Sequence, residues 1–127
     1  YAEEKLDDGT DRVVLRIPPM LAPIKCAILP LTKKDGLPEK AREIMDRLKF
    51  DHACMYEEKD SIGKRYRRMD AIGTPLCITV DHETLTDNSV TLRDRDTMQQ
   101  ERVPIDRVEQ LVMDNVDMRK ALRALGN

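Results

Sequence analysis

The sequence has few aromatic residues and few cysteines. Aromatic residues make up 3% of its 127 positions and tryptophan is absent, so aliphatic side chains and methionine must supply the hydrophobic core. Cys26, Cys54 and Cys77 include no CxxC pair, and each lies in a short apolar stretch. Buried reduced thiols account for this pattern and favour a reducing, cytosolic compartment. The alternative is a zinc site that adds His52 or His82, although their spacing matches no zinc motif.

Long apolar runs and enzyme motifs are also missing. No stretch approaches the roughly 20 residues of a membrane helix, and no charged start followed by an apolar segment and a cleavage site indicates a secretory signal. We therefore expect no membrane partner. The chain has no glycine-rich dinucleotide loop, no phosphate loop and no HExxH sequence, and neither histidine lies near a plausible nucleophile in the sequence. This pattern predicts a binding module without catalytic residues or metal ligands of its own.

The length and charge that are present fit one folded domain. A chain of 127 residues can bury a modest core. Apolar residues make up 40% and charged residues 36%, as in soluble globular proteins, and the formal net charge is -2. The chain begins with Tyr1 rather than Met, which indicates a piece of something longer. We expect residues 1–20 to be a linker from a preceding domain and residues 21–127 to form the domain itself.

Hydrophobic periodicity predicts alternating strands and helices, followed by a hairpin and a further helix. Strand-like runs lie at 13–17, 24–31, 52–58, 75–81, 88–93 and 98–103, and amphipathic helices at 35–50, at 61–73 and from 105 onward. Strands that alternate with helices are typical of parallel pairing with right-handed crossovers. A last amphipathic turn would place Met118, Leu122 and Leu125 inward. The expected fold is α/β, with a mixed five-stranded sheet flanked by about three helices.

The helix expected at 61–73 carries a basic cluster on a chain that is not basic overall. Lys64, Arg67 and Arg68 lie within one turn of each other, and Arg65 lies to the side. Guanidinium groups bind phosphates in a bidentate manner, so such a helix can follow an RNA backbone. A local patch on a neutral domain suits an RNA contact confined to one face. The alternative is a solvated helix face that binds nothing.

The segment TLRDRDTMQQERV (91–103) is the second polar cluster. Arginines alternate with acids in it and glutamines follow the turn, in the order Arg93, Asp94, Arg95, Asp96, Gln99, Gln100, Glu101 and Arg102. Equal numbers of both signs cannot serve bulk attraction of RNA. Arg and Gln donate to base acceptors and Asp accepts from base amino groups, which is what reading base edges in a single-stranded loop requires. The alternative is a self-paired charge network that pins the hairpin.

The same segments resemble a known family. RYRRMDAIGTPLCITVD (65–81) followed by SVTLRDRDTMQQERV (89–103) is similar to the C-terminal anticodon-binding domain of class II glycyl-tRNA synthetases of the dimeric type. LRIPPMLAPIKCAILPL (15–31) resembles the junction between the catalytic and anticodon-binding domains of that family. The resemblance covers about residues 13–112. Histidyl-, prolyl- and threonyl-tRNA synthetases share the general strand-helix-strand pattern, whereas TLRDRDT (91–97) favours glycine.

The resemblance implies an anticodon-binding domain at 21–127 whose partner is the anticodon loop of tRNA-Gly. The tRNA-binding residues expected from the two clusters are Lys64, Arg65, Arg67, Arg68, Arg93, Asp94, Arg95, Asp96, Gln99 and Arg102. The parent enzyme would be a cytoplasmic glycine–tRNA ligase that uses ATP and Mg²⁺ in a catalytic domain upstream of Tyr1. This chain alone would then need no cofactor and would not catalyse the reaction. The family dimerises mainly through the catalytic domain, which leaves this fragment free to be monomeric.

Two other functions remain open on the sequence. An accessory paralogue could use the same fold to hold other nucleic acids or proteins without synthetase activity. A small doubly wound domain could instead bind a nucleotide beyond its strand ends. The full-length gene tests the first, because an accessory protein lacks an intact class II active site. A thermal-shift screen against nucleotides and tRNA tests the second.

Overall fold

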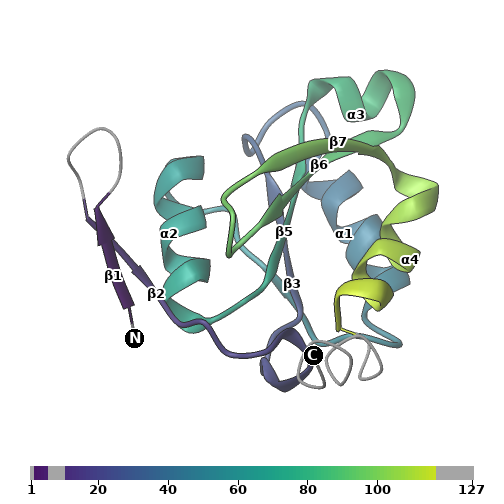
Figure 1. Ribbon diagram of the computed structural model, residues 1–127. Helices are drawn as coiled ribbons and strands as arrows, with labels where there is room; N and C mark the ends of the chain where they lie inside the picture. The colour runs from purple at the N-terminus through teal and green to yellow at the C-terminus, as the bar shows by residue number, and fades with distance from the viewer. Residues whose placement is uncertain (1, 6–10, 117–127) are drawn as a thin grey trace.

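A mixed five-stranded β-sheet forms the centre of the computed structural model, which describes residues 2–5 and 11–116 (Figure 1). In chain order its strands are β3 (Cys26–Pro30), β4 (Cys54–Tyr56), β5 (Leu76–Val80), β6 (Ser89–Asp94) and β7 (Gln100–Pro104). Their order in the sheet is β4-β3-β5-β6-β7. β3 pairs in parallel with β4 and β5, whereas β5, β6 and β7 pair in antiparallel fashion. The expected mixed five-stranded sheet is therefore confirmed.

Within the described residues, α-helices connect or follow these strands. They are α1 (Leu37–Leu48) after β3, α2 (Ile62–Ile72) after β4, α3 (His82–Asp87) after β5 and α4 (Ile105–Val116) after β7. Periodicity predicted three of them and missed α3, because a helix of 6 residues is too short to show a helical period. α3 begins instead with a capping box between Asp81 and Thr84. The last amphipathic turn expected at Met118, Leu122 and Leu125 lies outside the described residues.

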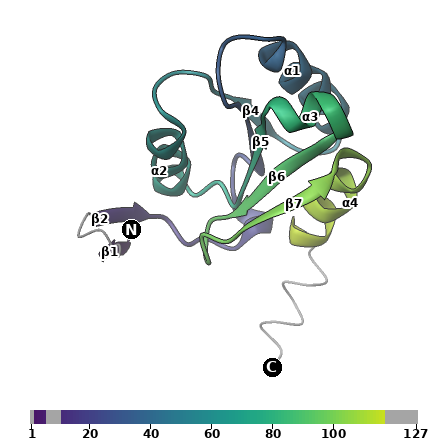
Figure 2. The same ribbon diagram turned by 90° about the horizontal axis from the view of Figure 1, so that it is seen from above.

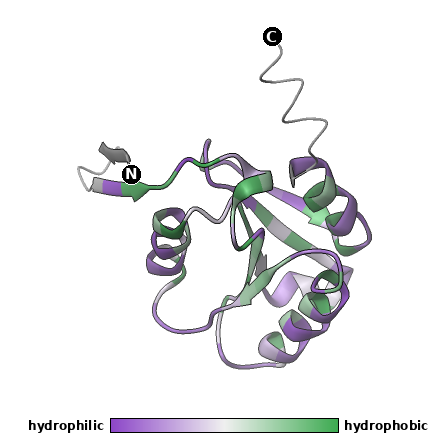
Figure 3. Cartoon of the chain, turned by 90° about the horizontal axis from the view of Figure 1, so that it is seen from below, coloured by the Kyte–Doolittle hydropathy of each residue, from purple (hydrophilic) through white to green (hydrophobic). Residues whose placement is uncertain are grey.

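The helices cover both faces of the sheet. α1 and α4 lie on one face and α2 on the other (Figure 2). Side chains alternate along each strand, so Cys26 and Ile28 of β3 pack toward α1 and α4, whereas Ala27 and Leu29 pack toward α2. All residues of β3 and β5 are buried, as expected for strands covered on both faces. Figure 3 shows that the helices carry both hydrophobic and hydrophilic residues, which suits their place between the sheet and solvent.

Residues that are recognisable in the sequence set both ends of α2. Ser61 Oγ accepts a hydrogen bond from Lys64 N, which caps the first turn. Gly73 follows the helix with φ of +84°, a left-handed conformation that glycine adopts without a steric penalty. A Cβ atom at Gly73 would also lie 3.2 Å from the Leu15 side chain. The expected end of the helix at Gly73 is confirmed, and this glycine also allows the chain before β3 to approach closely.

Part of the segment assigned to a linker is packed against the domain. β1 (Ala2–Lys5) and β2 (Asp11–Val14) form a separate two-stranded antiparallel sheet, and β2 contacts α2. Val14 is fully buried, and Leu15 N donates to Asp70 O at the end of α2 over 2.9 Å. The strand expected at 13–17 therefore begins and ends earlier. A short 3-10 helix, η1 (Pro19–Leu21), follows it.

The three cysteines are free thiols in two environments. Cys26 and Cys77 are buried as expected, whereas Cys54, on the edge strand β4, is half-buried. Cys26 and Cys54 lie opposite each other, with their Sγ atoms 3.2 Å apart. Burial raises the pKa of Cys77 to about 12, while the hydrogen bond with Cys26 lowers the pKa of Cys54. Over residues 2–5 and 11–116, no group of three His, Cys, Asp or Glu residues is placed to hold a metal ion, and no helix could span a membrane.

Candidate nucleic-acid interface

Three of the four cationic residues expected on α2 lie on its outer side. Lys64 and Arg67 are exposed, and the Arg68 side chain is 39% exposed. Arg68 donates to Asp60 Oδ2 over 2.6 Å and lies 3.0 Å from Glu57 Oε2. The hydrogen bond to Asp60 and the charge of Glu57 raise the pKa of Arg68. Lys64, Arg67 and Arg68 can therefore face phosphates from one helix, although Arg68 is already partly neutralised.

Arg65 does not belong to this surface, which corrects the expectation that it contacts RNA. The residue is 1% exposed. Its Nη1 donates to Pro30 O over 2.6 Å and to Glu57 O over 3.1 Å, and its Nη2 donates to Leu31 O over 3.2 Å. Burial lowers the pKa of Arg65. Its position three residues after Ile62 places it on the inner face of α2, where it ties the helix to the ends of β3 and β4.

Arg93 is also buried, where the sequence predicted a base contact. It donates from both terminal nitrogens to the Asp70 carboxylate, over 2.8 and 3.1 Å, and its guanidinium lies 4.7 Å from the centre of the Tyr66 ring. Asp70 is fully buried and also accepts from Arg12 Nη1 over 3.0 Å. Burial lowers the pKa of Arg93, but the hydrogen bonds and charge of Asp70 outweigh this effect and the pKa is raised. Arg93 thus joins β6 to α2.

Arg95, at the end of the same strand, is 2% exposed. Its Nη1 donates to Gly73 O over 2.9 Å and its Nη2 donates to Ile17 O over 2.8 Å. Its Nε donates to Asp96 Oδ1 over 2.9 Å. These bonds attach the hairpin to the end of α2 and to the chain before β3. The expectation that Arg93 and Arg95 donate to bases is therefore corrected, because their guanidinium groups are enclosed by protein acceptors.

The turn between β6 and β7 presents the remaining polar side chains. Asp94 Oδ1 accepts from Asp96 N over 2.7 Å and from Thr97 N over 3.2 Å, which closes the turn with a local side-chain bond. Met98 has φ of +61°, a conformation that residues other than glycine rarely adopt. Asp96 and Gln99 are exposed. The turn is thus tightly organised and places acidic and amide groups at the surface.

Arg102 is half-buried and is held by the residues around the start of α3. Its Nη1 and Nη2 donate to the two oxygens of Asp81 over 2.6 and 2.8 Å, and its Nε donates to Ser89 Oγ over 2.7 Å. The hydrogen bonds of this pair raise the pKa of Arg102 and lower the pKa of Asp81. Protein acceptors therefore hold Arg93, Arg95 and Arg102. Within residues 91–103, all of which the structure describes, the self-pairing that the sequence left open is found only between Arg95 and Asp96, because the carboxylates bound by Arg93 and Arg102 belong to Asp70 and Asp81.

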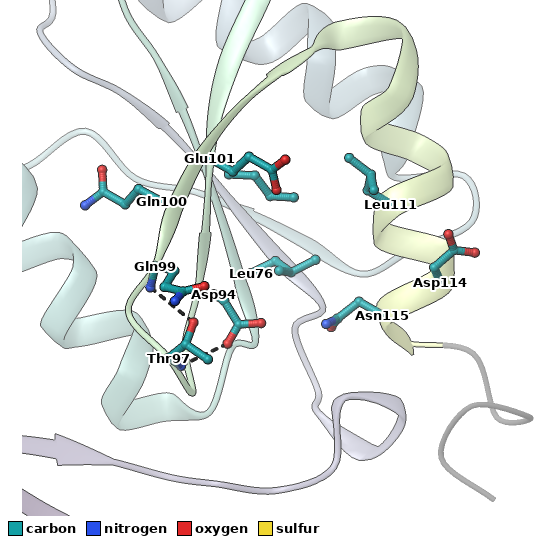
Figure 4. A pocket seen from close by; sticks show the side chains of 10 residues that line it. Leu76, Asp94, Thr97, Gln99, Gln100, Glu101, Leu111, Asp114 and Asn115 are labelled. Carbon is teal, nitrogen blue, oxygen red and sulfur yellow. Dashed lines mark hydrogen bonds between the residues drawn. The ribbon is translucent and has the colours of Figure 1, made fainter. Parts of the chain in front are cut away.

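An open groove of about 740 Å³ lies between the β6–β7 hairpin and α4 (Figure 4). The residues that line it are Leu76, Leu92, Asp94, Thr97, Gln99, Gln100, Glu101, Leu111, Asp114 and Asn115. A volume of this size is typical of small-ligand sites and can take a nucleobase. Two residues that the sequence predicted, Asp94 and Gln99, lie in this groove.

The groove combines apolar surface with carboxylates and amides. Its carboxylates belong to Asp94, Glu101 and Asp114, and none of the described residues that line it is Lys or Arg. Figure 4 shows Glu101 on β7 and Asn115 on α4 on opposite sides of the groove. Asn115 Oδ1 is buried and has no hydrogen-bond partner within residues 2–5 and 11–116. The groove therefore suits a ligand that donates N–H groups, and it does not attract phosphate.

The residues that α4 contributes to the groove, Leu111, Asp114 and Asn115, could not be recognised from the sequence. A polar residue on an amphipathic helix gives no sign of what lies opposite it. Glu101 was noted in the charge alternation but was not assigned to the site. A signal for it exists, because Glu101 lies two residues before Val103, which is buried toward α4, and alternate residues of a strand share a face.

The structure separates the two clusters that the sequence predicted. The outer residues of α2, which are Lys64, Arg67 and Arg68, belong to the helix on one face of the sheet. The groove with Asp94 and Gln99 lies beside α4, on the other face (Figure 2). The molecule thus has a cationic surface and an acidic groove rather than one combined site.

Comparison with known proteins places this arrangement in a family. A family model described as an anticodon binding domain matches residues 25–115. The chain belongs to the anticodon binding domain family. The matched region contains the whole five-stranded sheet, α1 to α3 and every residue of the groove, whereas β1 and β2 of this anticodon binding domain lie before it.

Curated relatives agree with this assignment. The chain is 54% identical over 105 residues to a glycine–tRNA ligase of Borrelia hermsii, and 52% identical over 117 residues to one of Clostridium tetani. It is 56% identical over 105 residues to a glycine–tRNA ligase of Malacoplasma penetrans. These matches cover 83%, 92% and 83% of this chain but 24%, 25% and 22% of the relatives. The resemblance seen in the sequence is confirmed, and the chain spans about a quarter of the length of these relatives.

Proposed function

We propose that this anticodon binding domain recognises the anticodon loop of tRNA-Gly as part of a glycine–tRNA ligase. The observation that carries the proposal is the groove beside the β6–β7 hairpin, because the described residues that line it include three carboxylates and two kinds of amide and no Lys or Arg. Relatives named glycine–tRNA ligase, at 52–56% identity, supply the choice of tRNA.

The genetic code defines what such a groove must recognise. Every glycine codon begins with GG, so the second and third anticodon bases of a glycine tRNA are both cytosine. Along its pairing edge cytosine has one amino donor and two acceptors. A site that reads cytosine therefore needs a carboxylate or carbonyl for the amino group and an N–H donor for the acceptors.

The groove has both kinds of group. We assign acceptance from the cytosine amino group to the carboxylates of Asp94, Glu101 and Asp114, and donation to the base acceptors to the amides of Gln99 and Asn115. Asp94 uses Oδ1 for the turn, so its Oδ2 is the oxygen assigned to the base. The leucines of the groove would pack against the flat face of the base.

The other residues expected from the sequence take different roles in this proposal. Lys64, Arg67 and Arg68 would contact phosphates of a part of the tRNA other than the bases in the groove, because α2 lies on the opposite face of the sheet. Asp96, whose side chain is 44% exposed, remains a proposed contact with the loop. The buried or paired arginines, which are Arg65, Arg93, Arg95 and Arg102, hold the site in shape.

In the parent enzyme, the reaction itself would take place outside this chain. ATP and Mg²⁺ would be used by a catalytic domain, which would also form the homodimer, and the enzyme would act in the cytoplasm. This chain would supply recognition of the tRNA and would be monomeric alone. Sedimentation of the isolated chain tests the last point.

The decisive experiment compares binding of this chain to the anticodon stem-loop of tRNA-Gly and to stem-loops in which either anticodon cytosine is replaced by uracil. Uracil has an acceptor where cytosine has its amino donor, so each replacement should cost roughly 1–3 kcal/mol, or about 5- to 150-fold in Kd. Glu101→Gln and Asp114→Asn should shrink that difference, whereas Asp46→Asn on α1 should not. Equal affinity for all stem-loops would favour an accessory module of the same fold.

A further inference from the structure

A segment before the family-matched region holds the turn of the hairpin. We call residues 11–17 the strap and residues 94–99 the tip. The strap comprises β2 and the residues that follow it, and it passes the end of α2 on its way to the tip (Figures 1 and 2). It lies outside residues 25–115, which the family model matches.

Arg12 is the buried link between the strap and the tip. It is 1% exposed, and its Nη1 donates to Asp70 Oδ2 over 3.0 Å and to Arg95 O over 2.9 Å. Asp70 in turn holds Arg93, the last residue of β6 that pairs with β7. One nitrogen of Arg12 thus joins the strap to α2 and to the backbone of the tip.

The tip also reaches back to the strap. Arg95 Nη2 donates to Ile17 O over 2.8 Å, and Arg16 Nη1 donates to Asp96 Oδ1 over 3.0 Å. The Arg95 bond is partly buried, whereas the pair of Arg16 with Asp96 is exposed to solvent and is correspondingly weaker. The strap therefore holds the tip mainly through Arg12 and Arg95.

The tip needs such support because it extends beyond the sheet. Arg93 and Gln100 are the last residues paired between β6 and β7, and Asp94 still pairs with Leu76 of β5. The part of the tip beyond Asp94 contains a residue, Met98, with φ of +61°. Asp94 and Gln99, which are the first and last residues of the tip, line the groove opposite α4. Any shift of the tip would move these two side chains relative to the α4 side of the groove.

We infer that Arg12 is a positioning residue for the groove, which makes the strap part of the anticodon-reading unit. Arg12 donates to Asp70 and to Arg95 O, and neither is a group that we assign to a base. It acts through its bond to Arg95 O, which fixes the distance between the tip and α4. At this distance, Asp94 and Gln99 can contact the same base as the groove residues of α4. The inference rests on the proposed function for its purpose, but the effect of Arg12 on the tip can be measured without RNA.

The first test measures cytosine preference in this chain, defined as the ratio of Kd for the uracil-substituted stem-loop to Kd for the normal one. Arg12→Met should lower the ratio on the order of tenfold, mainly by weakening the normal stem-loop. Arg12→Lys should restore most of the ratio, since both bonds come from one nitrogen that an ammonium group can replace. If Arg12→Met does not fold, Arg95→Lys releases the tip from its other side and should cause the same loss.

Ile44→Ala is the matched control, because it removes a buried side chain of α1 on the face of the sheet opposite α2. Ile44 packs near α4 but does not line the groove, and the change lowers stability without touching the strap, so the cytosine preference should equal that of the unmodified chain. An Arg12→Met protein that also keeps the preference, and only binds both stem-loops more weakly, would overturn the inference.

The second test is amide hydrogen exchange of the free chain. Arg95 N and Met98 N donate to Pro75 O and Asp94 O within or beside the tip. Arg12→Met should speed their exchange about tenfold or more relative to the amides of β3, and Ile44→Ala should not. If the unmodified chain shows no cytosine preference, the proposed function fails and this measurement alone decides the role of Arg12. Unchanged exchange at the tip would overturn the inference whatever the RNA result.

Discussion

α2 and the β6–β7 hairpin both carry three arginines within a short stretch, but they use them in opposite ways. On α2, Arg67 and Arg68 face outward and only Arg65 is buried. On the hairpin, Arg93 and Arg95 are buried. Both terminal nitrogens of Arg102 donate to the carboxylate of Asp81. The comparison shows that a high density of arginine does not by itself indicate an RNA contact.

The physical difference lies in what surrounds each guanidinium group. A helix on the surface has one inner face, so most of its charged positions remain in water. The hairpin instead lies against the end of α2 and the strap, where its arginines find the Asp70 carboxylate, Gly73 O and Ile17 O as acceptors. Its arginines therefore shape the site, and the acids and amides between them are left for a ligand.

The largest expected effect is on the hairpin side, at Asp70. Asp70→Asn would leave the guanidinium groups of Arg12 and Arg93 buried without their shared carboxylate. Removing one partner of a buried ion pair costs about 3–5 kcal/mol, which urea unfolding would measure. Asp46→Asn, which removes an exposed pair with Lys49, is the control and should change stability by at most about 0.5 kcal/mol. A cost at Asp70 below about 1 kcal/mol would contradict this account.

The second effect separates two arginines of the same helix. Arg65→Met should lower the free energy of unfolding by about 2–3 kcal/mol, because it leaves the buried carbonyl of Pro30, at the end of β3, and the carbonyl of Leu31 without their charged donor. Arg67→Met, an exposed change two residues along, should cost at most about 1 kcal/mol. Chemical unfolding of the two variants side by side provides the measurement. Equal costs would mean that α2 does not divide into an inner and an outer face as described.

The third effect is on RNA binding. Changing both Arg67 and Arg68 to Ala should weaken binding of tRNA about equally for any anticodon, because phosphate contacts carry no sequence information. The slope of log K against log salt should fall in magnitude by about 1 for each lost contact. Titrations at several salt concentrations measure both quantities. Arg47→Ala on α1 is the control, and normal binding by the double variant would show that the outer side of α2 is only a solvated face.

The smallest effect is a pH dependence at the pair of Asp81 and Arg102. The hydrogen bond from Arg102 lowers the pKa of Asp81 in the folded state. The pair therefore stabilises the fold fully above the ordinary carboxyl pKa of about 4. This contribution is lost as the pH falls through the lower pKa of the folded state. Asp81→Asn should therefore cost about 1 kcal/mol at pH 7 and progressively less below pH 4. Unfolding measured across this range provides the check. A cost that does not change with pH would indicate that the cap of α3, rather than the charge, stabilises this corner.

Most of the fold could be predicted because its signals are local. Apolar residues at helical spacing predicted α1, α2 and α4, short apolar runs predicted the five strands, and Gly73 predicted the end of α2. The structure adds α3, which is too short for periodicity to detect, and β1, whose polar sequence gives no sign of pairing. The strand expected at 13–17 was shifted, because its pairing with β1 could not be predicted without knowing that β1 forms.

The candidate site was predicted only in part. Asp94 and Gln99 line the groove as their place in the hairpin indicated, and Lys64 and Arg67 lie at the surface as their place on the helix indicated. Arg65 could have been placed by the same helical spacing, since it shares the inner face with Ile62 and the residues that follow at three- and four-residue intervals. The residues on the α4 side of the groove could not be predicted, because the sequence of a helix does not indicate which strand will lie opposite it.

The sequence by itself determined where the five strands of the main sheet and the three longer helices form, and to which family the chain belongs. Only the tertiary structure decided what each arginine binds. Arg12 and the carbonyl oxygen of Arg95 are 83 positions apart in the chain, and Arg12 and Asp70 are 58 apart. Every residue carries a backbone carbonyl, so no residue type marks the one that will accept a given guanidinium group. That choice depends on which segments are brought together when the chain folds, and it places the guanidinium groups of Arg93 and Arg95 among protein acceptors.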